Sequence, residues 1–247
     1  RRIFGEGALT ASFIPLLSDK LKNEKDTWAF ASTILSVTTV ITSILGLLGI
    51  VTCVIISFFV SNRSGLILTL TSWLLPYMIF ICLSAQISGI LNLLKSFTLP
   101  AISSVFLNIF LIFGCILSTF SGLSQESKIY FLVAAVLISG VVQLVFLYRE
   151  LIKKGASLKW SPDFKSAEWR SVKKLFLPGI LGASVAQLSV MSDRIIALWI
   201  GDHAVSALYY SERLTYFPVG IFAVALGAAC LPFMSKAVSN NDHEELM

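Results

Sequence analysis

Long stretches without a charged residue dominate the chain. Six of them contain between 18 and 36 residues, and a helix needs about 20 apolar residues to cross the hydrocarbon core of a bilayer. None alternates apolar and polar residues in the two-residue pattern of a membrane-barrel strand. The pattern predicts an all-α polytopic membrane protein, a transmembrane helix bundle with six complete spans and a partial one that ends near Leu17. The six stretches are Thr27–Asn62, Ser64–Leu94, Phe97–Gln125, Ile129–Tyr148, Leu175–Ser192 and Leu214–Ser235.

The charges between these stretches predict which loops share a side of the membrane. Loops on one side hold thirteen Lys and Arg residues, and loops on the other hold two, Arg63 and Lys128. Because positive charge accumulates on the cytoplasmic side, we expect the basic loops to be cytoplasmic. The predicted helices are 1–18, 30–60, 66–92, 99–120, 129–149, 174–200 and 205–235. They form a transmembrane lobe at 1–148, a basic cytoplasmic loop at 149–173, a helical hairpin at 174–235 and a cytoplasmic loop at 236–247.

Composition agrees with a membrane protein. Of the 247 residues, 56% are hydrophobic and 13% are charged, whereas a soluble domain averages about 25% charged residues. This excludes an ordinary cytosolic enzyme, a disordered chain and a disulfide-stapled secreted domain. Because the chain starts at Arg1 inside a helical pattern and stops in a polar segment, we expect it to be an internal piece of a longer protein.

The basic loop at 149–173 carries two tryptophans, Trp160 and Trp169. One interpretation is the usual positive cytoplasmic loop with tryptophans that anchor it at the interface. The other is contact with anionic lipid head groups, which attract Lys and Arg near the membrane surface. No basic patch on a soluble domain suggests nucleic acid.

Residues for metal, redox or nucleotide chemistry are sparse. The four cysteines stand singly within apolar stretches, and there are two histidines and no Gly-Lys dipeptide of a phosphate-binding loop. We therefore expect buried, unpaired cysteines, no cofactor and no metal site.

Charged residues inside predicted spans are the strongest functional signal, because an Arg or Asp at mid-helix costs about 2.5–3.5 kcal/mol on insertion scales. Asp193-Arg194 and Glu212-Arg213 lie at similar depths on either side of a turn near Gly201. Two interpretations follow. Asp193 can pair with Arg213 and Arg194 with Glu212, or at least one arginine can face a cavity that holds an anionic substrate. A third group, Arg1, Arg2 and Glu6, begins the chain and could also be a cytoplasmic flank.

The same residues carry a family resemblance. The segment RRIFGEGA followed by FIP at 1–15 is similar to a signature of the MurJ (MviN) family, the lipid II flippases of bacterial cell-wall synthesis. The segment LYYSERL, then PVGI, VALG and LP, at 208–232 resembles a second family motif. Glu212 stands where the family usually has Asp, Gly5 where Ala is frequent, and Arg194 where an uncharged residue is common.

The resemblance implies a fold with fourteen transmembrane helices, of which this chain would supply the second to the eighth. It implies a lipid II flippase of the bacterial inner membrane, active in peptidoglycan biosynthesis, with membrane lipids around it and a cavity lined by arginines. Carried over by position, Arg1 or Arg2 and Arg213 would be cavity residues, with Glu6, Glu212 and Asp193 beside them. Two helical halves would alternate access. Because the sequence shows no nucleotide-binding loop, we expect an ion gradient or the membrane potential to drive the movement.

Two alternatives remain at this point. A related exporter of drugs or of another lipid-linked sugar would share the fold, but it should not need arginines in both motifs. A membrane enzyme acting on a lipid pyrophosphate would need acid–base or metal-binding groups in its loops, where the acids here are scattered among lysines.

Overall fold

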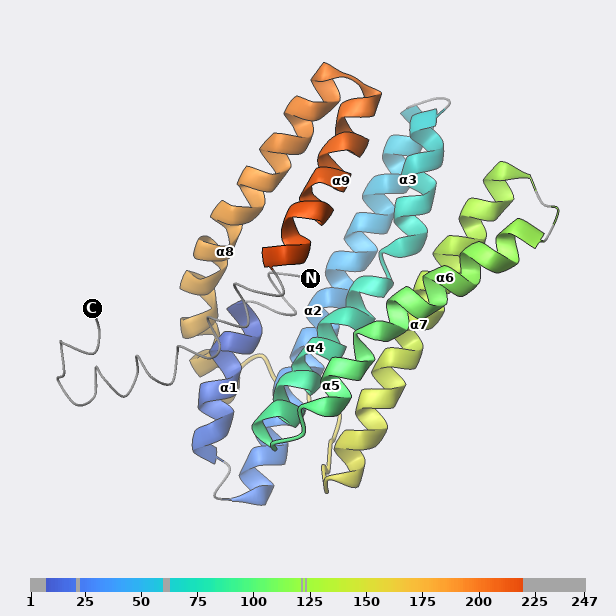
Figure 1. The fold of residues 1–247 in the computed structure, drawn as a ribbon. Helices are drawn as coiled ribbons and strands as arrows, with labels where there is room; N and C mark the ends of the chain where they lie inside the picture. The colour runs from blue at the N-terminus through green and yellow to red at the C-terminus, as the bar shows by residue number, and fades with distance from the viewer. Residues whose placement is uncertain (1–7, 21–22, 60–62, 121, 123, 220–247) are drawn as a thin grey trace, which may run out of the picture. The chain divides into compact units, whose positions relative to one another are not determined.

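The computed structural model describes residues 8–20, 23–59, 63–120, 122 and 124–219. The helices of this part are shown in Figure 1. They are α1 (Ala8–Lys20), α2 (Glu24–Phe59), α3 (Arg63–Leu74), α4 (Tyr77–Leu93), α5 (Thr98–Ser103), α6 (Val105–Phe120), α7 (Gln125–Lys153), α8 (Ala167–Ile200) and α9 (Asp202–Pro218).

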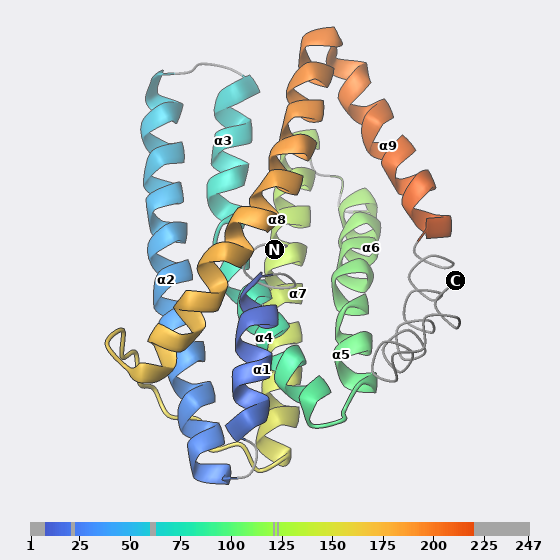
Figure 2. The ribbon, with the colours of Figure 1, turned by 90° about the vertical axis from the view of Figure 1, so that its left-hand side faces the viewer.

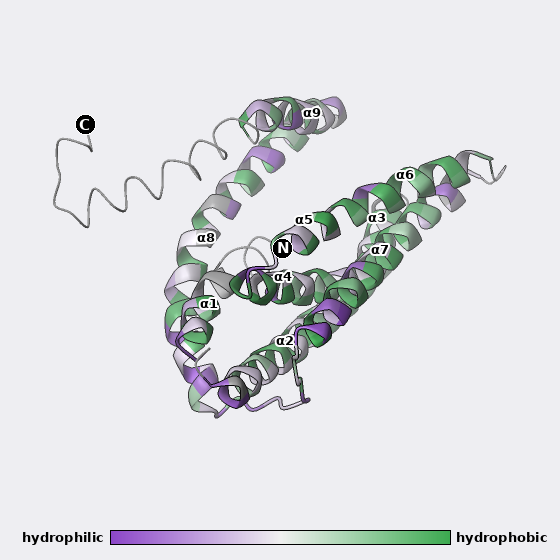
Figure 3. Cartoon of the chain, turned by 60° about the horizontal axis from the view of Figure 1, so that its bottom comes forward, coloured by the Kyte–Doolittle hydropathy of each residue, from purple (hydrophilic) through white to green (hydrophobic). Residues whose placement is uncertain are grey.

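Five helical segments are long and apolar enough to cross a membrane, which confirms the helical prediction for this part of the chain. They are Lys25–Phe59, Gly65–Leu93, Thr98–Phe120, Ser127–Lys153 and Ala167–Ile200. Figure 3 shows hydrophobic residues along most of α2, α6 and α7. The predicted span at 205–235 begins as α9 and continues outside the described residues.

Two predicted spans are interrupted. The span expected at 66–92 divides into α3 and α4 around Pro76, because proline lacks the N–H that a continuous helix needs. The amides of Met78 and Ile79 donate to the carbonyls of Leu75 and Pro76 and close a tight turn there. The span expected at 99–120 divides at Ser104 into α5 and α6.

The predicted loop at 149–173 is shorter in the structure. Helix α7 continues to Lys153 and α8 begins at Ala167, so that the connection is 154–166. Arg170 and Lys173 therefore lie on a helix. Charged residues are unfavourable in the hydrocarbon core, but Lys, Arg and Glu are compatible with a helix. A helix can therefore continue past the bilayer with charged residues on it.

The chain divides into two compact units, Arg1–Ser184 and Val185–Met247. In the first, α4 packs against α1, α2, α5 and α7, and α6 packs along α7. Its buried core lies at the end that carries Lys20, Lys25 and Lys153, here called the basic end. The core comprises Phe13, Leu17, Phe30, Ala31, Ile34, Ile87, Ile90, Leu91, Leu147, Leu151, Ala156, Val172 and Phe176.

Away from the basic end, the helices of the first unit present apolar side chains outward. In α2 the exposed set runs from Ile44 to Phe59. Among the cysteines, Cys82 is buried, Cys53 is partly exposed and Cys115 is exposed. The expectation of a buried cysteine is therefore wrong for Cys115, because α6 presents that face outward rather than to α7. Cys230 lies outside the described residues.

Candidate functional site

A sharp turn at Gly201 connects the last part of α8 to α9 within the second unit. Gly201 has φ 147° and ψ 164°, a backbone conformation that is essentially restricted to glycine. Its amide donates to the Ala197 carbonyl at 3.2 Å, and its own carbonyl accepts from the Ala204 amide at 3.0 Å. Figure 2 shows the two helices leaving this turn and diverging.

The four charged residues expected inside the spans lie on these two helices. Asp193 and Arg194 are on α8, and Glu212 and Arg213 are on α9. At a rise of about 1.5 Å per residue, Arg213 lies about 17 Å along α9 from Asp202. Asp193, Arg194 and Arg213 are exposed, and Glu212 is partly buried. Such a placement is costly in lipid and calls for a polar surrounding.

Tyr209, one helical turn earlier on α9, holds the Arg213 side chain. The Nη2 group of Arg213 donates to the hydroxyl of Tyr209 at 3.0 Å. The guanidinium carbon also lies 5.4 Å from the centre of the Tyr209 ring, within the range of a cation–π contact. The ring of Tyr209 in turn meets Tyr210 edge to face, with centroids 5.7 Å apart. Two contacts from one residue therefore restrict the arginine while most of its donors stay available.

A cavity of about 270 Å³ lies beside this arrangement, within the second unit. Arg194 from α8 and Glu212 from α9 both reach it, together with the hydroxyl-bearing residues Ser206, Tyr209 and Tyr210. Val205 and Leu208 also line it. The sequence predicted that Arg194 lies near Glu212, and the two residues do line the same cavity.

The two ion pairs considered from the sequence are not formed. Among the described residues, neither Asp193 nor Arg194 forms an ion pair with Glu212 or Arg213. The physical reason is direction, because successive residues of a helix point about 100° apart. Asp193 and Arg194 cannot both face α9, and two residues at equal depth need not touch when the helices diverge.

Three of the residues singled out in the sequence, Arg1, Arg2 and Glu6, lie outside the described residues. Tyr209 is the contact that the sequence analysis did not assign. It stood in the quoted motif, and its spacing of four residues from Arg213 is the signal that could have found it.

The arginines of this site offer donors that suit an anion. A guanidinium presents forked N–H donors, stays protonated and matches the oxygens of phosphate and carboxylate groups. Over the part of the chain that the structure describes, no group of three or more His, Cys, Asp or Glu residues could hold a metal ion.

Comparison with known proteins places the chain. The family model described as lipid II flippase MurJ matches residues 1–247. The chain belongs to the MurJ family.

Several MurJ proteins are similar to the chain. A probable lipid II flippase MurJ of Buchnera aphidicola subsp. Baizongia pistaciae is 34% identical, covering 99% of this chain and 49% of the relative. The lipid II flippase MurJ of Burkholderia cenocepacia is 32% identical, again over 99% of this chain and 49% of the relative. A solved structure, lipid II flippase MurJ in an inward closed conformation, matches with a TM-score of 0.76 and 26% identity over 97% of this chain and 50% of its own.

The chain thus spans about half the length of the MurJ relatives that it matches. With five helical segments of span length among the described residues and this family membership, it is an all-α, multi-pass protein of the bacterial inner membrane.

Proposed function

We propose that the full-length MurJ protein containing this chain moves lipid II from the cytoplasmic to the outer face of the inner membrane. Family membership over residues 1–247 supports the substrate class. Lipid II carries a pyrophosphate between its polyprenyl tail and its sugars, so that its recognition calls for a fixed cation in a polar cavity within the bilayer.

The environment of Arg213 is the observation that supports the proposal. It lies on α9, within the span predicted at 205–235, has no carboxylate partner among the described side chains, and is positioned by Tyr209. An unpaired arginine in a membrane helix is retained at a cost of about 2.5–3.5 kcal/mol. A pyrophosphate that enters this environment of low dielectric offsets the cost, because the attraction between charges is stronger there than in water.

The remaining parts of the proposal concern the surroundings of Arg213. Arg1 or Arg2, with Glu6, would also bind the substrate, and Arg194, Asp193 and Glu212 would tune the charge around Arg213. The head group would cross by alternating access while the polyprenyl tail stays in lipid. An inward closed conformation of a related flippase supports a mechanism with more than one conformation. An ion gradient or the membrane potential would drive the cycle, and no catalytic step is involved.

The test is export of lipid II in bacteria depleted of their own flippase and supplied with the full-length gene. We expect Arg213→Ala to reduce the appearance of lipid II on the outer face at least a hundredfold, and Arg213→Lys to retain part of it, because lysine keeps the charge but loses the fork. Tyr209→Phe keeps the ring and removes the hydroxyl acceptor. We expect it to reduce lipid II export several-fold on its own and to cause no further reduction when it is combined with Arg213→Ala.

Arg170→Ala is the matched control. Arg170 is an exposed arginine on the first turns of α8, outside the proposed cavity, and its loss should leave export unchanged. Export that survives Arg213→Ala at equal membrane abundance would contradict the role of the arginine. A wild-type protein that inserts correctly and restores no export would contradict lipid II as the substrate and point to another lipid-linked sugar.

A further inference from the structure

The connection between α7 and α8 is bound along α2 at the basic end of the first unit. The backbone N–H of Lys159 donates to the Ser32 hydroxyl at 3.0 Å, and that of Ser161 donates to the Ser36 hydroxyl at 3.0 Å. Residues two apart in an extended chain are about 6.6 Å apart, and residues four apart in a helix rise about 6 Å. This match lets the connection follow one face of α2 from Lys159 to Ser161, within the segment 155–161.

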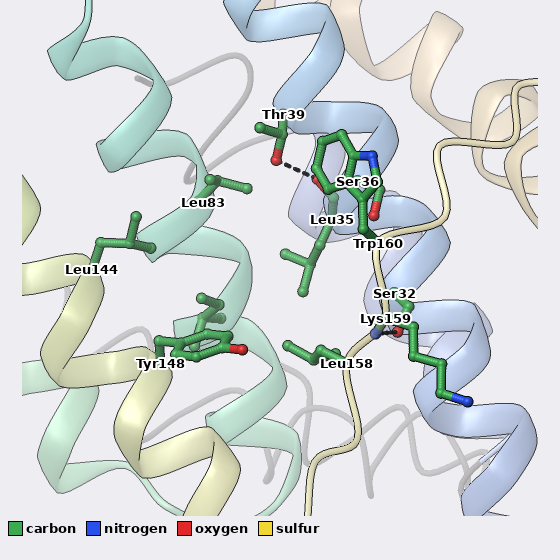
Figure 4. Close-up of a pocket in the computed structure, with 11 residues that line it drawn as sticks. Ser32, Leu35, Ser36, Thr39, Leu83, Leu144, Tyr148, Leu158, Lys159 and Trp160 are labelled. Carbon is green, nitrogen blue, oxygen red and sulfur yellow. Dashed lines mark hydrogen bonds between the residues drawn. The ribbon is translucent and has the colours of Figure 1, made fainter.

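An apolar cavity of about 350 Å³ lies on one side of this segment. Figure 4 shows Leu83, Leu144 and Tyr148 from α4 and α7 facing Leu35 of α2 and Leu158 of the segment. Thr39 and Trp160 lie towards its other end. We call this cavity the acyl groove.

A second cavity of about 610 Å³ lies on the other side of the same segment. It is lined by two exposed lysines, Lys25 and Lys159, by Trp28, and by hydroxyl and small residues, and none of its described lining residues is acidic. Asp26, next to Lys25 in sequence, accepts a hydrogen bond from the Asn23 side chain at 2.8 Å. We call this cavity the lysine pocket. The hydroxyl and small lining residues are Ala29, Ser32, Thr33, Gly155, Ser157 and Ser161.

The two cavities meet, because Ser32 and Lys159 line both. Lys25 begins the span-length segment of α2, and Thr39 lies about 21 Å further along the helix axis. Trp28 lines the polar part, as tryptophans do at the border between head groups and acyl chains. A polar, cationic pocket at the border of a span thus continues into an apolar groove within it.

We propose that this composite site binds an anionic phospholipid, with its phosphate between Lys25 and Lys159 and one acyl chain in the acyl groove. The occupant is a lipid rather than free phosphate, because the groove offers apolar contacts that only a chain can use. A bound lipid bridges the 155–161 segment to α2, and so holds the connection that leads into α8 against the rest of the first unit. The site is separate from Arg213 and does not depend on the proposed transport.

The test measures phosphatidylglycerol binding to the purified full-length protein in neutral detergent, by native mass spectrometry across a titration. We expect the double variant Lys25→Gln/Lys159→Gln to weaken binding about tenfold, since each basic residue near an anionic lipid contributes measurably. The matched control is Lys173→Gln/Lys174→Gln, which removes the same charge from exposed positions of α8 that line neither cavity. It should change binding less than twofold, and thermal unfolding should show that both variants are folded.

Two further ligands distinguish the parts of the proposal. Phosphatidylcholine should bind at least tenfold more weakly than phosphatidylglycerol, and glycerol phosphate at equal concentration should not displace the lipid. An equal loss in the control variant, equal binding of phosphatidylcholine, or displacement by glycerol phosphate would each overturn the site as proposed. Arg213→Ala should bind phosphatidylglycerol as the wild type does, so that failure of the transport proposal and failure of the lipid site give different results.

Discussion

The core at the basic end of the first unit and the hairpin of the second unit are built on opposite principles. In the core, side chains from α1, α2, α4, α7 and α8 bury one another, and Phe30 and Leu91 are 1% and 0% exposed. In the hairpin of α8 and α9, large apolar side chains such as Trp199 and Phe217 are 87% and 72% exposed. One region is packed internally, and the other presents its surface outward.

The charged residues follow the same division. At the basic end, Lys20 pairs with Glu168 at 3.4 Å and Lys153 with Glu150 at 3.3 Å. In the hairpin, Arg213 has a tyrosine as its partner, and Arg194 and Glu212 share a cavity without pairing. Side-chain packing therefore stabilises the first region, where the charged groups are also paired, whereas the second keeps its donors available for a ligand or for a further part of the protein.

The largest expected difference in stability comes from replacing one phenylalanine in each region by alanine. Phe30→Ala removes a ring that is buried among five helices, and we expect it to lower the free energy of unfolding by about 3 kcal/mol, chiefly through the cavity that it leaves. Phe217→Ala removes a ring of the same size from an exposed position, and we expect a change below about 1 kcal/mol. Unfolding of the full-length protein in detergent measures both.

An equal loss from Phe217→Ala would break the comparison. It would mean that the hairpin surface is covered in the full-length protein, as a chain that spans half of its relatives' length allows. An unchanged stability of Phe30→Ala would contradict the packed core itself.

Replacing two glycines by alanine tests the same comparison with a smaller expected change in stability. A Cβ at Gly140 of α7 would lie 2.7 Å from Cδ2 of Tyr77 and 3.2 Å from Cβ of Phe80. We therefore expect Gly140→Ala to push α4 and α7 apart and cost about 1–3 kcal/mol. At Gly182 of α8 a Cβ would meet nothing within 4 Å, and Gly182→Ala should be neutral or stabilise by up to about 1 kcal/mol.

The measurement is again unfolding of the full-length protein, with the two alanine variants side by side. A loss at Gly182 that matches the loss at Gly140 would show that a helix from outside the described residues packs closely on α8. A neutral Gly140→Ala would mean that Tyr77 can move aside without cost.

The fold was predictable where one physical quantity decides it. Length and apolarity decide spans, and the charge-free stretches located every span-length helix of the described residues. Local chemistry decides interruptions, and Pro76 gave a reason for the break between α3 and α4. The break between α5 and α6 falls at Ser104, and a serine does not by itself predict the end of a helix. Both ends of α7 and the start of α8 were misplaced because charge was used as the end of a helix, when it marks only the end of the membrane.

The site was predictable in its residues but not in its contacts. The cost of an arginine within a span was enough to single out Arg213 and Arg194. Whether they pair depends on the direction of each side chain around its helix and on the divergence of the two helices, and neither follows from equal depth along the chain. The part of the site at Arg1, Arg2 and Glu6 stays a prediction.

The smallest expected effect tests whether the hairpin neutralises itself. Arg194→Gln and Glu212→Gln, alone and together, form a double-mutant cycle whose coupling energy reports the interaction between the two side chains. Because the two share a cavity without an ion pair, we expect a coupling below about 0.3 kcal/mol in the unfolding of the full-length protein. Lys153→Gln and Glu150→Gln provide the matched cycle, since that pair is in contact at 3.3 Å, and it should reach the few tenths of a kcal/mol typical of exposed helix pairs. A coupling of 1 kcal/mol or more between Arg194 and Glu212 would mean that the hairpin closes on its own charges, and Arg213 alone would then remain free to meet an anion.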